Sequence, residues 1–195
     1  MKISEARQVY NVQIRAYRDQ QVSLAKQKNE LEEKMNTTPD GRNVYANEAA
    51  ILELTIKAVD EKQTQYQDYM DKLLEQWSAT ANMVSARQQG EAMEEYVADM
   101  GKLMEVARRL MKGAIVPASD ERKLIEYSME LYQTAKNMGA LAKQKEKEEY
   151  DSLWGDEEEK AYEDPMETAD NTEAFAEGPK IVEVSDTVAR VTAKE

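Results

Sequence analysis

The residues best suited to metal or acid–base chemistry in this chain are glutamates that stand next to one another. Glu94 and Glu95 form a pair, and Glu157, Glu158 and Glu159 form a run. Clustered carboxylates can hold a divalent cation weakly. Charge runs on helices and polar segments are more often simply hydrated. We therefore interpret both clusters as solvated surface and expect no metal site.

Other kinds of catalytic chemistry lack the residues they need. The chain contains no cysteine and no histidine, so the usual zinc ligands, a thiol nucleophile and Glu-x-x-His di-iron pairs are excluded. No GxSxG or SxxK stands in a supporting context, and GxxxxGK[ST] and GxGxxG patterns are absent. We expect no enzyme activity, no cofactor and no small-molecule substrate.

Recognition chemistry is more evident between positions 93 and 111. Apolar residues recur there at alternating steps of four and three, which places them on one face of a helix. This methionine stripe consists of Met93, Val97, Met100, Met104, Ala107 and Met111. Because the methionine side chain is flexible, Met-rich faces suit grooves that accept several partners. The stripe predicts either a groove wall for a client helix or, as is commoner for such faces, part of the core.

A second candidate for recognition is the pair Leu153 and Trp154, which directly precedes an acidic run. A tryptophan beside clustered charge is typical of a short binding motif, because the ring supplies a large contact area and the acids attract a basic surface. The alternative is that both side chains fold back and cap the last helix. The sequence leaves both interpretations open.

Helices must position these residues. The chain has only 7 Gly and 4 Pro among 195 residues, and its long stretches of Ala, Leu, Met, Glu, Lys and Gln favour an all-α fold. With 41% hydrophobic and 33% charged residues, one domain with a modest core is expected. No segment approaches the ~20 apolar residues that cross a bilayer. We therefore expect a cytoplasmic protein without membrane insertion.

Two long helices are predicted over residues 3–35 and 52–84. Each has an apolar seam with alternating steps of four and three residues, the repeat of coiled coils. Tyr10 and Tyr17 lie in the first seam, and Tyr66 and Leu73 lie in the second. The connection near 36–43 contains Thr38-Pro39-Asp40-Gly41, and Asn43 can cap the second helix. Because such a turn forces neighbours to run antiparallel, residues 1–89 are predicted to form a long helical hairpin.

The register of this hairpin follows from matching the two seams. It places Tyr10 opposite Trp77 and Tyr17 opposite Met70. Four polar residues interrupt the seams: Arg7, Gln21, Lys28 and Gln63. Either they fix the register, or their aliphatic parts cover the edge of the seam while their polar ends remain in water. In both cases the two helices need a third helix, a second copy or a partner to be stable.

The second half is predicted to contain two shorter helices within 90–150, packed on the hairpin or extending it. Gly90 lowers the helix propensity at this point, although a helix can continue through a single glycine. The third helix spans roughly 91–112 and ends at Gly113, and the fourth runs from Ser119 to about Glu149.

Residues 151–195 form an acidic tail. They hold 14 acidic and 4 basic residues, a net charge of −10 out of −13 for the whole chain. This tail is predicted to be largely disordered, because it contains few large apolar residues, and Ile181–Val184 only weakly suggests a strand. The basic residues Arg108, Arg109 and Lys112 are a possible intramolecular partner, in which case the tail would shield the methionine stripe. The nearly neutral remainder excludes general nucleic-acid binding.

These patterns predict a non-enzymatic protein–protein interaction module, a chaperone-like adaptor or assembly factor that binds a helical protein client. The small, acidic, Met- and Gln-rich helical layout is similar to that of chaperones of bacterial flagellar and type III export systems. The alternative is a self-assembling coiled-coil structural or scaffolding protein, whose seams would pair in a homo-oligomer. The candidate partner-binding residues are Met93, Val97, Met100, Met104, Met111, Leu153 and Trp154.

Overall fold

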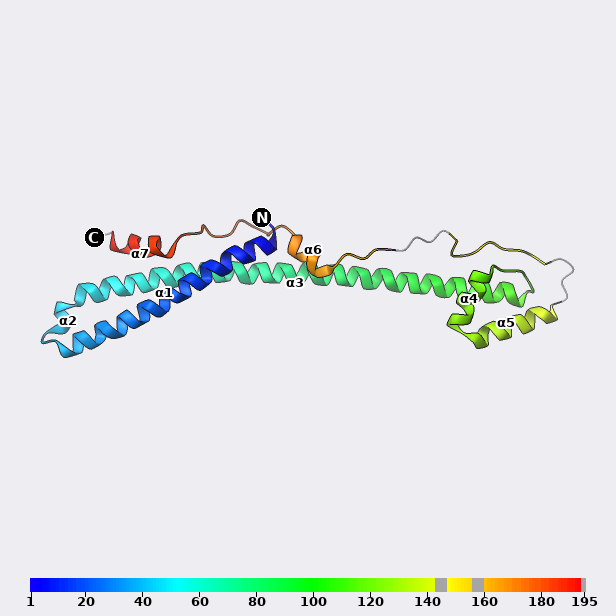
Figure 1. Ribbon diagram of the computed structural model, residues 1–195, viewed down its shortest axis with the longest axis horizontal. Coiled ribbons are helices and arrows are strands. Elements are labelled where there is room, and N and C mark those ends of the chain that lie inside the picture. Colours follow the sequence, from blue (N-terminus) through cyan, green and yellow to red (C-terminus); the bar gives the residue numbers. More distant parts are fainter. Residues whose placement is uncertain (143–146, 156–159, 194–195) are drawn as a thin grey trace. The chain divides into compact units, whose positions relative to one another are not determined.

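The computed structural model describes residues 1–142, 147–155 and 160–193 (Figure 1). Their regular secondary structure is all helical, which confirms the predicted fold class. The helices are α1 (Ile3–Thr37), α2 (Gly41–Val44), α3 (Ala46–Met111), α4 (Ala118–Tyr127), α5 (Met129–Leu141), α6 (Pro165–Asn171) and α7 (Val184–Thr192). None of the helices within these ranges is long and apolar enough to cross a membrane. The chain divides into two compact units, Met1–Val84 with Glu163–Glu195, and Ser85–Tyr162.

The predicted helical hairpin is present in the first unit, where α1 packs against the first part of α3. Buried side chains recur every seventh residue along both helices, as a coiled-coil seam requires. They are Ile3, Tyr10, Tyr17, Leu24 and Leu31 in α1 and Val59, Tyr66 and Leu73 in α3.

The register of the hairpin differs from the predicted one by about one helical turn. The Tyr17 ring lies 5.5 Å from the Tyr66 ring, one turn before its predicted partner Met70. Trp77, the predicted partner of Tyr10, lies beneath the guanidinium of Arg7, about one turn earlier in α1. Both contacts therefore differ from the predicted register in the same direction.

The connection between the helices explains this shift. Asp40 adopts the left-handed conformation with φ 55°, and the single turn of α2 follows at once. Asn43 lies inside α2 and donates from its side chain to Asp40 Oδ1 at 2.7 Å, so it is not the predicted cap of α3. Antiparallel partners lie at equal distances from the middle of the connection. With α1 ending at Thr37 and α3 beginning at Ala46, that middle falls earlier in the chain than the midpoint between the matched seams 3–35 and 52–84.

The C-terminal segment, defined here as residues 163–193, packs along the hairpin and corrects the prediction of a largely disordered tail (Figure 1). Its helix α6 begins with Pro165, preceded by Asp164, whose carboxylate accepts hydrogen bonds from two amides of the first turn. An extended stretch then leads to α7. The segment contains few large apolar residues, but hydrogen bonds from the hairpin to its main chain also hold it, and composition does not reveal these bonds.

The second unit contains the last part of α3 together with α4 and α5. The helix predicted over 91–112 is the continuation of α3, which runs through Gly90. The predicted stop at Gly113 is confirmed by its φ of 81°. The unit's core is formed by Leu103, Val106, Leu110, Val116, Leu124 and Ala135.

The helix predicted from Ser119 to about Glu149 is two helices. Ser128 has extended backbone angles and separates α4 from α5. Its hydroxyl accepts a hydrogen bond from the Leu131 amide at 3.2 Å, which caps the start of α5. The helix α5 ends at Leu141.

Candidate functional site

Four tyrosines of the hairpin direct their hydroxyl groups toward the C-terminal segment. We call Tyr10, Tyr17, Tyr66 and Tyr69 the tyrosine face. Each donates a hydrogen bond to a main-chain carbonyl: Tyr10 to Pro179 at 2.8 Å, Tyr17 to Val182 at 2.9 Å, Tyr66 to Lys180 at 3.1 Å and Tyr69 to Ala176 at 2.8 Å. The hydroxyl groups of the hairpin therefore bind main-chain atoms of this segment, while side chains of the segment, among them Val184 and Val188, pack against the hairpin core.

Two of these hydroxyls make a second hydrogen bond. Tyr66 accepts from the backbone amide of Val182 at 2.9 Å. The Tyr17 oxygen lies 2.6 Å from Thr187 Oγ1. Because a phenol carries one proton, donation from Tyr17 to the Val182 carbonyl leaves the Thr187 hydroxyl as the donor between those two oxygens. Val182 thus has both its amide and its carbonyl bound by side chains of the hairpin.

A glutamine extends this backbone recognition beyond the tyrosines. Gln76 donates from Nε2 to the Glu173 carbonyl at 2.8 Å and accepts from the Phe175 amide at 2.9 Å. The start of α1 contributes as well, since the Ile3 amide donates to the Thr172 carbonyl at 2.9 Å. That amide has no partner within its own helix, so the C-terminal segment completes the end of α1.

The contacts follow a single direction. As the C-terminal segment advances, its partners move from Ile3 to Tyr17 along α1 and from Trp77 to Tyr66 along α3. The segment is therefore parallel to α1 and antiparallel to α3. A segment of the same chain thus lies along the two helices, where the sequence predicted a third helix, a second copy or a partner.

The four side chains of the tyrosine face are buried. Tyr17 and Tyr66 are fully buried, and Tyr10 and Tyr69 are almost so. Burial raises the pKa of Tyr10, Tyr17 and Tyr69, because the phenolate would lose its hydration. Among the described residues, every buried side-chain nitrogen and oxygen has a hydrogen-bond partner. Each of the four hydroxyl groups of the face is hydrogen-bonded to the C-terminal segment.

Two of the polar residues that interrupt the seams have specific partners. The Arg7 guanidinium lies 5.4 Å from the centre of the Trp77 ring and 3.5 Å from Asp170 Oδ1. The Trp77 indole donates to the same oxygen at 2.8 Å. Gln21 donates to Asp60 of α3 at 2.6 Å.

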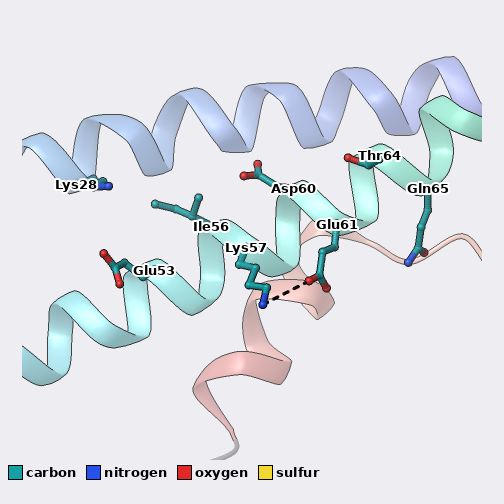
Figure 2. Close-up of a pocket in the computed structure, with 8 residues that line it drawn as sticks. All are labelled: Lys28, Glu53, Ile56, Lys57, Asp60, Glu61, Thr64 and Gln65. Carbon is teal, nitrogen blue, oxygen red and sulfur yellow. Dashed lines mark ion pairs between the residues drawn. The ribbon is translucent and has the colours of Figure 1, made fainter.

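An open groove of about 500 Å³ also lies between α1 and α3. Figure 2 shows Ile56 and Asp60 pointing toward α1, while Lys57 and Glu61 form an ion pair of 3.9 Å. The lining is mostly charged and includes Lys28, another of the residues that interrupt the seam. The groove is open and Ile56 is the one apolar residue in its lining, so we assign it no ligand.

The predicted methionine stripe lies on the part of α3 that belongs to the second unit. Met93, Val97 and Met104 are 63%, 62% and 46% exposed, whereas Met100 is half-buried. Met111 packs against the core of that unit. The C-terminal end of the stripe therefore belongs to the core, as one interpretation predicted. Binding of a partner helix by the more N-terminal part of the stripe stays a prediction.

Leu153 and Trp154 fold back into the second unit. Trp154 is 9% exposed, and its indole donates to Asp99 Oδ1 at 2.8 Å. The Lys123 ammonium lies 4.2 Å from the centre of the ring. The Leu153 amide donates to the buried carboxylate of Asp120 at 2.9 Å. Trp154 packs on α3 and α4, so it is a core residue here rather than an exposed anchor.

The predicted contact between the tail and the basic residues beside the stripe stays a prediction. Within the second unit, Arg108 and Arg109 bind Glu105, and their hydrogen bonds lower the pKa of that carboxyl to about 2. Arg109 also lies 4.1 Å from the centre of the Tyr150 ring.

The acidic clusters show no metal site within the described part of the chain, where no group of three or more suitable ligands gathers. Glu94 and Glu95 are exposed on α3, and Glu157, Glu158 and Glu159 lie outside the described residues.

Comparison with family models, with curated proteins and with solved structures found no match to this chain. The tyrosine face was absent from the predicted site residues, although three of its members were predicted as seam residues. The presence of tyrosines in the seams could have revealed this site. A buried tyrosine needs a partner for its hydroxyl, and a seam of two helices provides few acceptors, so these tyrosines indicated a third segment.

Proposed function

We propose that this chain is a cytoplasmic, non-enzymatic protein-interaction module, an adaptor or assembly factor whose tyrosine face binds a polypeptide segment in extended conformation. One observation carries the proposal: four buried tyrosine hydroxyls bind the main chain of the C-terminal segment. The preferred client is thus an extended segment, which modifies the helical client expected from the sequence. The exposed part of the methionine stripe stays a candidate for a helical one.

Backbone recognition supports exchange of one bound segment for another. Every polypeptide offers carbonyls, so the hydroxyls of the tyrosine face can accommodate segments of different sequence. When the C-terminal segment leaves, water can replace its carbonyls at the hydroxyls, which avoids the cost of leaving buried polar groups unpaired. The resident segment is tethered and has a high local concentration. A client therefore needs a tighter interaction or a prior release of this segment.

Two neighbouring residues of the C-terminal segment provide the test. Val182 is 7% exposed and Ile181 is 40% exposed. An unpaired carboxylate at the buried position costs several kcal/mol, so Val182→Asp should release the segment while Ile181→Asp should not. We expect the full-length Val182→Asp protein to bind a fluorescent peptide of residues 172–193, measured by anisotropy. The full-length Ile181→Asp protein, still occupied by its own segment, should bind this peptide far more weakly.

Hydrogen–deuterium exchange separates failure of release from failure of binding. The amides of Ala174 and Val182 donate to Met1 and Tyr66 in the closed state, so they should lose protection in the Val182→Asp protein. If they do, and the helices of the hairpin keep their protection, the tyrosine face is open. An open face that binds no peptide would refute the proposed function.

Self-assembly is a second candidate, favoured by the identity of the bound segment. Because the occupant belongs to the same chain, a second copy carries the same ligand, and exchanged segments would link copies together. Light scattering over a range of concentrations should then show growth that Val182→Asp abolishes and Ile181→Asp retains. Growth that is the same in both variants would indicate pairing through the helical seams instead.

A further inference from the structure

We infer that the tyrosine face selects segments that carry a glycine followed by proline, with a branched apolar residue four positions after the glycine. This inference rests on the proposed function and names the class of its ligand. In the C-terminal segment these positions are Gly178, Pro179 and Val182. Main-chain hydrogen bonds provide the binding, and these three positions restrict which main chain can approach.

Gly178 is required by the close approach of two tyrosine rings. A Cβ at this position would lie 2.5 Å from Tyr10 Cζ and 2.7 Å from Tyr69 Cε1, well inside ordinary van der Waals contact. The Tyr10 ring has little room to withdraw, because it is 3% exposed and packs 4.8 Å from the Tyr69 ring. Every side chain larger than hydrogen must therefore displace a buried ring or lift the segment from the face.

Pro179 complements this glycine. Proline directs the residue before it toward extended backbone angles, so it restricts Gly178, which would otherwise be the most flexible residue of the segment. Its carbonyl accepts the hydrogen bond from Tyr10 at 2.8 Å. The Gly-Pro pair thus combines the small size needed for close approach with a reduced entropy of ordering.

Val182 is the side chain that the face buries. Its neighbours Ile181 and Glu183 are exposed, as expected when successive side chains of an extended segment point in opposite directions. The backbone of Val182 is held at both its amide and its carbonyl, which fixes where its side chain enters. A branched side chain suits this extended backbone because branching at Cβ favours β-region angles.

The test compares four peptides of residues 172–193 on the full-length Val182→Asp protein. They are the natural sequence, Gly178→Ala, Val182→Ala and the control Glu177→Ala, which changes an exposed residue beside the glycine. We expect the natural peptide and the control to bind equally. The Gly178→Ala and Val182→Ala peptides should bind at least tenfold more weakly.

The outcomes distinguish this inference from the proposed function. If the natural peptide does not bind the Val182→Asp protein with its tyrosine face open, both this inference and the proposed function are refuted. Equal binding of the natural and Gly178→Ala peptides would overturn the inference and leave the proposed function standing. A second measurement uses the intact chain: Gly178→Ala, but not Glu177→Ala, should speed hydrogen exchange at the Val182 amide, and equal exchange in the two proteins would also overturn the inference.

Discussion

The Tyr66 hydroxyl accepts a hydrogen bond from the backbone amide of Val182 at 2.9 Å, across 116 residues of sequence. The same hydroxyl donates to the Lys180 carbonyl at 3.1 Å. A single phenol therefore uses both of its hydrogen-bonding capacities on the C-terminal segment. It joins the two ends of the chain in one unit, while residues between them form the other.

Tyr17→Phe should lower the unfolding free energy of the first unit by about 1–3 kcal/mol, because the buried Val182 carbonyl loses its donor. Denaturant unfolding would measure this change, and hydrogen exchange at 182–187 would locate it. Tyr96→Phe is the matched control, since Tyr96 is 58% exposed, and it should change stability by less than about 0.5 kcal/mol. Equal midpoints for the two variants would contradict the role assigned to the Tyr17 hydroxyl.

Alkaline pH should weaken the first unit. Burial raises the pKa of Tyr10, Tyr17 and Tyr69 in the folded chain above the value of about 10 found in unfolded chains. The folded state thus keeps protons that the unfolded state loses. The stabilisation is complete below pH ~10 and falls as pH rises toward the folded pKa values.

Denaturant midpoints between pH 8 and 12, with tyrosinate absorbance recorded in parallel, would test this pH dependence. Tyr17→Phe removes one of the titrating groups, so its midpoint should fall less steeply than that of the natural chain. Identical slopes would show that Tyr17 does not contribute to the alkaline transition.

Two glycines of the second unit should respond oppositely to alanine. A Cβ at Gly139 would overlap the Leu110 carbonyl, whereas nothing lies within 4 Å of a Cβ at Gly101. Gly139→Ala should lower stability by about 1–3 kcal/mol through overpacking. Gly101→Ala should raise it by about 0.5–1 kcal/mol, because glycine is entropically costly inside a helix. Thermal unfolding of both variants would measure these shifts, and a stabilising Gly139→Ala would refute the close packing of α5 on α3.

Trp154→Ala should destabilise the second unit by about 3–5 kcal/mol, as expected for removing a buried indole. Hydrogen exchange over 103–135 would show where protection is lost. Leu141→Ala provides the control, because Leu141 is 81% exposed. If exchange in this region were unchanged by Trp154→Ala, Trp154 would be an exposed recognition residue after all.

The sequence predicted the helices better than their pairing. Heptad spacing identified Tyr10, Tyr17, Tyr66 and Leu73 as seam residues, because every turn of a buried seam repeats the same constraint. The register depends instead on the single connection between the two helices. The left-handed conformation of Asp40 and the one-turn helix that follows it leave no periodic pattern in the sequence. The fourth helix was predicted as continuous for a similar reason, since one cap at Ser128 ends it.

The candidate site was less predictable than the fold. Its ligand is the C-terminal segment, whose composition is typical of disordered chains. The hydrogen bonds that hold this segment are accepted or donated by main-chain atoms, which all residues share. Gly178 and Pro179 are visible in the sequence, but they indicate a break in regular structure unless the tyrosine rings beside them are known. Leu153 and Trp154 were assigned two possible roles because their partners are distant in sequence: Asp120 accepts from the Leu153 amide and Asp99 from the Trp154 indole.

Residues 85–162 separate the hairpin from its C-terminal segment in sequence, which affects the nascent chain during synthesis. Residues 85–162 must be translated after the hairpin and before the segment begins, which takes roughly 4–16 s for these ~80 residues at about 5–20 residues per second. During that interval the tyrosines emerge from the ribosome without their eventual cover. A partner present at the site of synthesis would therefore meet them before residues 163–193 have been made.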